Sequence, residues 1–197
     1  MNKRQLFNAL AFAAVVSLTA CGEDKPAFHG VDITGADYAQ GWELSDQNGQ
    51  VRTLKDFSGK VVIVFFGYTQ CPDVCPTTMQ EMVEVKRLLG PDGDRVQSVF
   101  ITIDPERDTA NLLQQYMASF DPGFVALRPS PQQLPQVTKA FKIYYKKIEG
   151  KSTTSYTMDH SAGSFTFDPQ GRVRLYNRYG SGAQALAEDV KILLKAR

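Results

Sequence analysis

Apolar residues run without interruption from Val61 to Phe66, and this run is the clearest structural signal in the chain. A strand with one face in solvent alternates apolar and polar residues, whereas a strand covered on both faces is apolar throughout. The run therefore predicts a central strand with layers on both of its sides. A second apolar segment, Val96–Ile103, predicts the next strand.

Helical spacing follows each of these strands. Between residues 77 and 89 four apolar residues lie near helical intervals, and Thr77 with Gln80 matches a capping box that opens a helix. Apolar residues between 113 and 120 mark a second helix, and Ser130, followed by a proline, is expected to open a third. A strand, a helix and a further strand in this order form the unit from which α/β sheets are built.

Two β-hairpins frame this unit. Asn48-Gly49 lies between two short strand-like runs, and residues 168–171 separate Ser164–Phe167 from Arg172–Tyr176. The order of elements predicts an α/β fold, in which a mixed sheet has helices on both faces and carries added β-hairpins. A chain of 197 residues is long enough for one good core and short for two. We therefore expect one domain, residues 42–197.

The first twenty residues form a separate segment. Lys3 and Arg4 precede a stretch from Leu6 to Ala20 that contains no charged residue, as in a secretory signal peptide. At about 1.5 Å per residue a helix over that stretch is ~22 Å long, short of the ~30 Å hydrocarbon core of a membrane. We expect residues 1–20 to be removed on export. Without Lys3 and Arg4 the chain has 20 of its 22 basic residues and 21 acidic ones, so no excess of basic residues favours nucleic-acid binding.

The residues before Cys21 resemble the lipobox of bacterial lipoproteins. In that family the cysteine becomes the lipidated first residue, which implies an anchor at Cys21 on the periplasmic face of a bacterial membrane. An ordinary leader with an incidental cysteine is the alternative. Residues 21–41 are polar and mixed, and they contain Pro26 and several glycines, so we expect a lipidated tether.

Cys71 and Cys75 lie where the central strand ends and a helix begins. Sites form at this edge of open sheets, and the N–H groups of a helix start favour the thiolate, which attacks disulfides and binds metals. Three residues separate the cysteines, so both sulfurs share one face if the helix extends back to include them. A static disulfide is the structural alternative, although a bridge over so small a loop constrains the unfolded chain little.

A third ligand is expected from far along the chain. Two thiolates are too few for a closed zinc site, which has four ligands. Of the two histidines, His29 falls in the expected tether and should be solvated, whereas His160 lies just ahead of the second hairpin, on a predicted loop. Two sulfurs with one imidazole suit copper(I), and copper(II) tolerates the same set. Met158, two residues away from His160, is expected to pack rather than to bind.

Three motifs in order resemble the Sco/SenC family of copper chaperones: Tyr68–Pro76, Ile103–Thr109 and Asp159–Ala162. The resemblance covers roughly Trp42 to the C-terminus and implies a thioredoxin-like fold. It also implies that the chain delivers copper to the dinuclear copper centre of cytochrome c oxidase subunit II. The family's metal ligands fall on Cys71, Cys75 and His160.

Three acidic residues near these motifs are candidates for supporting roles. Asp159 can fix the tautomer of His160 by bonding its non-ligating nitrogen, or it can be a plain surface residue, since adjacent residues often point apart. Asp73, between the cysteines, is expected to shape the loop or to face a partner. Asp104 closes a strand at the same edge of the sheet, which places it near the site.

The same cysteines suit other functions. A thiol-disulfide reductase would use Cys71 and Cys75 as a redox-active pair, would keep the oxidase's copper-binding cysteines reduced, and would need no imidazole. A peroxidase of the peroxiredoxin type and a copper or redox sensor without catalysis are further alternatives. Copper loading and disulfide formation consume the same sulfurs, so a thiol reductant is an expected partner beside the oxidase and the membrane.

Overall fold

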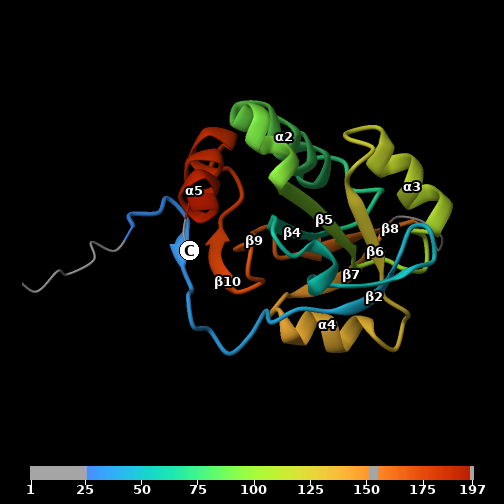
Figure 1. Ribbon diagram of the computed structural model, residues 1–197. Helices are drawn as coiled ribbons and strands as arrows, with labels where there is room; N and C mark the ends of the chain where they lie inside the picture. The colour runs from blue at the N-terminus through green and yellow to red at the C-terminus, as the bar shows by residue number, and fades with distance from the viewer. Residues whose placement is uncertain (1–25, 151–154, 196–197) are drawn as a thin grey trace, which may run out of the picture.

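The computed structural model describes residues 26–150 and 155–195; the expected leader and Cys21 lie outside them. Strands and helices alternate through the middle of the chain, between residues 61 and 140 (Figure 1). In order they are β1 (Val31–Asp32), β2 (Glu43–Asp46), β3 (Val51–Thr53), η1 (Leu54–Phe57), β4 (Val61–Gly67), α2 (Val74–Leu89), η2 (Gly90–Arg95), β5 (Val96–Thr102), α3 (Ala110–Ala118), β6 (Val125–Arg128), α4 (Leu134–Ala140), β7 (Tyr145–Glu149), β8 (Tyr156–His160), β9 (Ser164–Phe167), β10 (Val173–Asn177) and α5 (Ala183–Lys195).

One eight-stranded sheet runs through the molecule in the order β1-β10-β9-β4-β5-β6-β2-β3. Strands β4, β5 and β6 are parallel, and the other pairings are antiparallel. Every residue of β4 is buried, which confirms the prediction of a central strand covered on both faces, and every residue of β5 is buried as well. Both expected hairpins, β2–β3 and β9–β10, are present.

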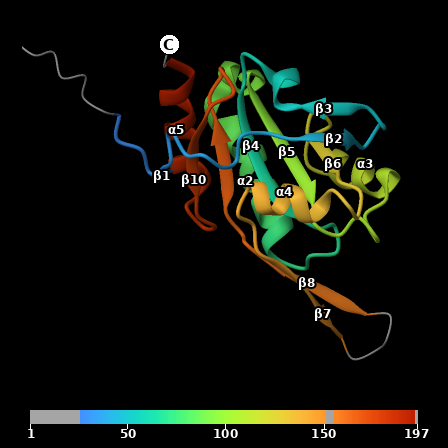
Figure 2. The ribbon, with the colours of Figure 1, turned by 90° about the horizontal axis from the view of Figure 1, so that it is seen from below.

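Helices cover both faces of this sheet, so the predicted α/β class is confirmed (Figures 1 and 2). Helices α2 and α5 pack against each other on one face, and α4 lies on the opposite one. Below the sheet the ring of Phe141, which follows α4, lies 5.1 Å from that of Phe66 on β4. Within the described ranges, none of the helices combines the length and the apolar character that a membrane span requires.

The packed part of the chain begins earlier than residue 42. Strand β1 pairs with β10, and just before it the backbone N–H of Gly30 donates to Asp189 at 2.8 Å. Ala39 is fully buried. The expectation of a free tether over residues 21–41 is therefore wrong for its second half. Backbone hydrogen bonds help to hold that segment, and such bonds leave no periodic pattern in the side chains.

Helix α2 begins at Val74, three residues before the predicted start. The hydroxyl of Thr77 donates to the carbonyl of Asp73 at 2.8 Å inside the first turn instead of capping the helix. Pro76 is tolerated there because the first N–H groups of a helix have no intrahelical partner. The helix therefore reaches back to include Cys75. Helix α4 likewise starts at Leu134, after a turn that begins at Ser130.

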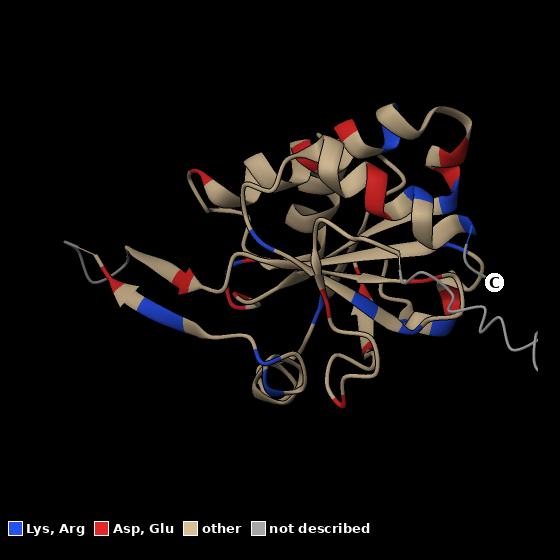
Figure 3. Ribbon diagram, turned by 90° about the vertical axis from the view of Figure 1, so that its left-hand side faces the viewer, with Lys and Arg blue, Asp and Glu red and all other residues tan. Residues whose placement is uncertain are grey.

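Besides β1, three strands were not expected from the sequence: β6, β7 and β8. Strand β6 has four residues, and β7 exposes Lys146 and Lys147, so neither shows a clear alternation of apolar residues. Strands β7 and β8 form a separate two-stranded sheet that projects from the body and carries both basic and acidic residues (Figures 2 and 3). His160 is the last residue of β8, so the prediction of a loop at this position is wrong.

Candidate metal centre

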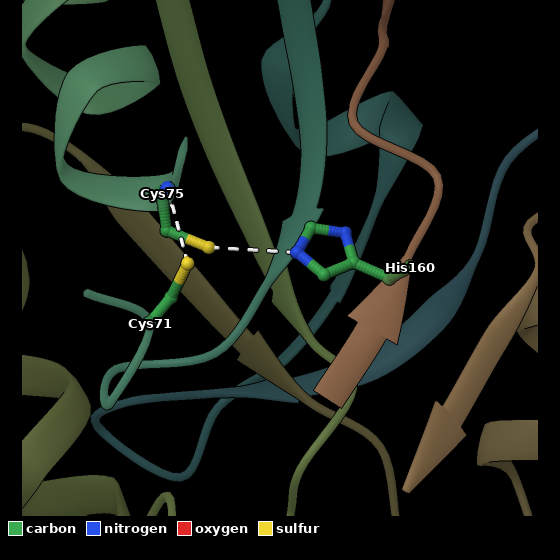
Figure 4. A group of neighbouring side chains, drawn as sticks. All are labelled: Cys71, Cys75 and His160. Carbon is green, nitrogen blue, oxygen red and sulfur yellow. Dashed lines mark hydrogen bonds between the residues drawn. The ribbon is translucent and has the colours of Figure 1, made fainter. Parts of the chain in front are cut away.

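Cys71, Cys75 and His160 converge at the carboxyl end of β4 (Figure 4). One ligand atom from each lies within 4.8 Å of the other two, and Cys75 Sγ is 3.7 Å from His160 Nε2. Across residues 26–150 and 155–195 this is the one group of three or more histidine, cysteine or acidic side chains arranged to hold a metal. Residues 85 positions apart thus meet at the edge of the sheet where the sequence predicted a site.

The cysteine pair is built into the junction between β4 and α2. Cys71 lies in the connecting loop and is partly exposed, whereas Cys75 lies in the first turn of α2 and is fully buried. The backbone N–H of Cys75 donates to Cys71 Sγ at 3.4 Å. Gly67 ends β4 beneath them, and a Cβ atom there would come within 2.8 Å of Cys75 Sγ. A glycine at this point leaves room for the buried sulfur.

The two sulfurs are coupled, and their pKa values shift in opposite directions. The hydrogen bond from Cys75, together with those from the backbone N–H groups of Asp73 and Cys75, lowers the pKa of Cys71 to about 3 against the opposing effect of burial. The same bond to Cys71, with burial, raises the pKa of Cys75. The pair therefore presents a thiolate at Cys71 at neutral pH, beside a buried thiol.

The imidazole ring of His160 is oriented by its surroundings. Its Nδ1 lies 2.9 Å from the carbonyl oxygen of Ser161. A carbonyl can only accept, so Nδ1 carries a proton, and Nε2 is the ring nitrogen that faces the sulfurs. The rings of Phe65 and Tyr68 contact the imidazole edge to face, each with its centroid 6.0 Å from that of His160. This tautomer is the one that a metal ligand requires.

The acidic candidates do not touch the ligand atoms. Asp159 is exposed, and the Ser161 carbonyl occupies the place proposed for its carboxylate, so Asp159 is the plain surface residue of the two alternatives. Asp73 precedes α2 without capping it through its side chain, and it acts on Cys71 through its backbone N–H. Asp104 is buried and accepts a hydrogen bond from the hydroxyl of Tyr156 at 2.9 Å.

The sequence analysis did not identify Gly67 or Ser161 as residues that shape the site. Gly67 contributes by having no side chain, and Ser161 contributes through its backbone carbonyl. Neither effect leaves a signal in a single sequence. His29 is half exposed, but it pairs with Glu188 at 2.7 Å. Met158 packs against the core, as expected.

Comparison with known proteins agrees with this architecture. The SCO1/SenC family model matches residues 31–195. An SCO2-like protein of Rickettsia felis is 34% identical over 151 residues, which are 76% of this chain and 74% of that protein. The mitochondrial SCO2 homologue of Bos taurus is 34% identical over 152 residues, and the match covers 76% of this chain and 57% of the relative.

A solved relative carries a metal. The structure of Bradyrhizobium japonicum ScoI with copper bound is 40% identical to this chain, with a TM-score of 0.70 over 78% of this chain and 97% of that one. The family model covers more than half of the chain and includes both cysteines and His160. This chain therefore belongs to the SCO1/SenC family.

Proposed function

We propose that the chain binds one copper ion through Cys71, Cys75 and His160 and delivers it to the dinuclear copper centre of cytochrome c oxidase subunit II during assembly. The observation that carries the proposal is the position of His160 Nε2, 3.7 Å from Cys75 Sγ. Disulfide exchange needs a thiolate and a leaving thiol but no imidazole. An imidazole held in the ligating tautomer beside two sulfurs is therefore better explained by metal binding.

The donor set fits the proposed cargo. Two sulfurs with one imidazole suit copper(I), and the low pKa of Cys71 means that one sulfur is already deprotonated. With bonds of ~2.3 Å to sulfur and ~2.0 Å to nitrogen, as in zinc sites, a trigonal metal separates those two ligand atoms by about 3.7 Å. The observed separation of Cys75 Sγ and His160 Nε2 matches this value, so these two ligands need little movement on loading. The copper-bound ScoI relative supports the same choice of metal.

The proposal is tested by anaerobic metal analysis of the reduced protein, with copper and zinc in competition, on the wild type and on His160→Ala. We expect one copper per chain in the wild type, preference for copper over zinc, and loss of tight binding in the variant, with both thiols still titratable. Met158→Leu is a matched control on the same strand and should load normally. Equal copper binding by His160→Ala and wild type would exclude the ligand set.

A thiol-disulfide reductase is the second candidate, because Cys71 is a partly exposed thiolate backed by the buried thiol of Cys75. This arrangement provides an attacking and a resolving sulfur. The two functions separate in a strain that lacks the native protein. His160→Ala should fail to restore oxidase copper content if the chain delivers copper, whereas normal oxidase maturation by that variant would favour the reductase.

We also propose that the chain is exported, anchored through lipid on Cys21 at the periplasmic face of a bacterial membrane, and reduced by a thiol reductant before it is loaded. Copper and a disulfide exclude each other at these sulfurs. Mass spectrometry of the mature protein should find an acylated Cys21 as its first residue, and Cys21→Ser should release the protein from membranes. Quantitative copper uptake by the fully oxidised protein would contradict the need for a reductant.

A further inference from the structure

The hairpin that carries His160 is not part of the main sheet. Among the described strands, β7 and β8 hydrogen-bond only to each other (Figure 2). Two hydrogen bonds join Tyr144 and Ser161, the residues that flank the two strands where the hairpin meets the body. The Ser161 N–H donates to the Tyr144 carbonyl at 3.0 Å, and the Tyr144 N–H donates to Ser161 Oγ at 3.1 Å. These bonds lie within the hairpin, so they do not determine its orientation against the cysteines.

The side chain of Arg107 bonds to both the hairpin and the cysteine loop. Arg107, in the loop between β5 and α3, donates through Nη1 to the carbonyl of Tyr156 at 2.9 Å and to Gln70 Oε1 at 3.2 Å. Its guanidinium carbon lies 3.5 Å from the centroid of the Tyr156 ring and 5.7 Å from that of Tyr68. Gln70 precedes Cys71 directly. Both halves of the metal centre are therefore tied to the same arginine.

A buried carboxylate holds this arginine in place. Asp104 is 3% exposed, pairs with Nε of Arg107, and accepts the hydroxyl of Tyr156 at 2.9 Å. Its own backbone N–H donates to Thr102 Oγ1 at 3.0 Å, at the end of β5. Asp104 thus links the hairpin to a central strand of the main sheet. This explains why an acidic residue at this edge is buried although it touches no ligand atom.

Tyr156 is well placed to orient His160. The two residues lie at opposite ends of β8 and on the same face, four positions and about 13 Å apart. Contacts at Tyr156 hold one end of β8, and contacts at Ser161 hold the other. A strand held at both ends has a fixed orientation, and this orientation decides whether Nε2 of His160 points at the sulfurs.

We infer that Arg107, together with Asp104 and Tyr156, is a latch that positions His160 against the cysteine pair. The three are positioning residues, since none of them contacts a ligand atom directly. The inference deepens the proposed copper function and rests on it where copper is the readout. Loss of the latch lowers the fraction of molecules in which His160 is in place, and the apparent copper affinity falls in proportion to that fraction.

The test uses Arg107→Lys, which keeps the charge beside Asp104 but loses the planar fork, and Tyr156→Phe, which removes only the hydroxyl. Arg172→Lys is a matched control, because Arg172 also bridges a buried aspartate and a glutamine, Asp168 and Gln170, in the β9–β10 turn. One hydrogen bond is worth roughly threefold to tenfold in an equilibrium. We expect the copper Kd to rise about tenfold in Arg107→Lys and about threefold in Tyr156→Phe, and to stay unchanged in Arg172→Lys.

Two further measurements separate positioning from a general loss of structure. In a His160→Ala background, Arg107→Lys should have no further effect on copper binding, because the residue that it positions is gone. In the reduced protein without metal, amide hydrogen exchange over residues 156–160 should be at least about threefold faster in Arg107→Lys, while β4 exchanges as in the wild type.

The outcomes distinguish the two proposals. An equal loss of affinity in the wild-type and His160→Ala backgrounds, or unchanged exchange over residues 156–160, overturns the latch. If the wild type binds copper no better than His160→Ala, the proposed ligand set fails. The exchange measurement then decides the latch alone, since it does not depend on the metal.

Discussion

The cysteine pair is held by the main sheet, whereas His160 is held by a hairpin that joins no other strand among the described residues. Cys75 is fully buried at the start of α2, directly above Gly67 of the central strand. His160 is only partly buried and depends on ring contacts, a backbone carbonyl and the Arg107 contacts. Substitutions at the cysteine pair should therefore change the stability of the whole fold, whereas substitutions at His160 should leave that stability largely unchanged.

The largest contrast is expected between Cys75→Ala and His160→Ala. Both variants lose a ligand, so copper affinity, measured by competition with a chelator, should fall by at least about 100-fold in each. Removing the buried sulfur also leaves a small cavity, and the free energy of unfolding should drop by about 1–2 kcal/mol in Cys75→Ala alone. Urea denaturation of the metal-free reduced proteins measures this difference. Equal losses of stability in the two variants would remove the distinction between the halves.

Gly67→Ala tests whether the packing beneath the sulfurs supports the site. The added methyl would lie 2.8 Å from Cys75 Sγ and 2.8 Å from the Phe65 ring, in a core that has no space to accept it. We expect a loss of about 1–3 kcal/mol in the free energy of unfolding, together with weaker copper binding. Gly123→Ala is the control, since its nearest neighbour is the movable Asp121 carboxylate at 3.1 Å. Normal stability and copper binding in Gly67→Ala would contradict this role.

The ionisation of the sulfur half can be followed by alkylation. The pKa of Cys71 is lowered to about 3, so the thiolate is present above that pH and is lost below it. The alkylation rate of Cys71 should therefore be nearly constant between pH 5 and 8, whereas an ordinary thiol gains about tenfold per pH unit over this range. Cys75, whose pKa is raised, should stay unmodified. The urea-unfolded protein serves as the control, and a tenfold rise per pH unit in the folded protein would refute the lowered pKa of Cys71.

The smallest effect is expected from Asp159→Asn. The carboxylate is exposed, and the Ser161 carbonyl already holds Nδ1 of the neighbouring histidine, so the copper Kd should change by less than about twofold. Isothermal titration of the reduced protein under anaerobic conditions measures this change. A loss near tenfold would show that Asp159 supports the ligand after all and would give the hairpin a second means of orienting His160.

The sequence predicted the sulfur half of the site better than the imidazole half. The unbroken apolar run of β4 and the cysteines that follow it are local signals, and they gave the correct strand, edge and spacing. The hairpin of His160 has exposed lysines and short strands, so it gave no comparable pattern. The predicted start of the domain at residue 42 was too late for a similar reason, because β1 is held by backbone pairing at the edge of the sheet.

By itself the sequence determined the α/β class and singled out two sulfurs at the end of the central strand and one imidazole as candidate ligands, because each of these depends on local periodicity or on the chemistry of single residue types. Only the tertiary structure decided how the imidazole reaches the sulfurs, which tautomer faces them and which arginine connects the two halves. Those features depend on contacts between residues far apart in the chain, and the distance between such residues in space is fixed only when the whole sheet is folded.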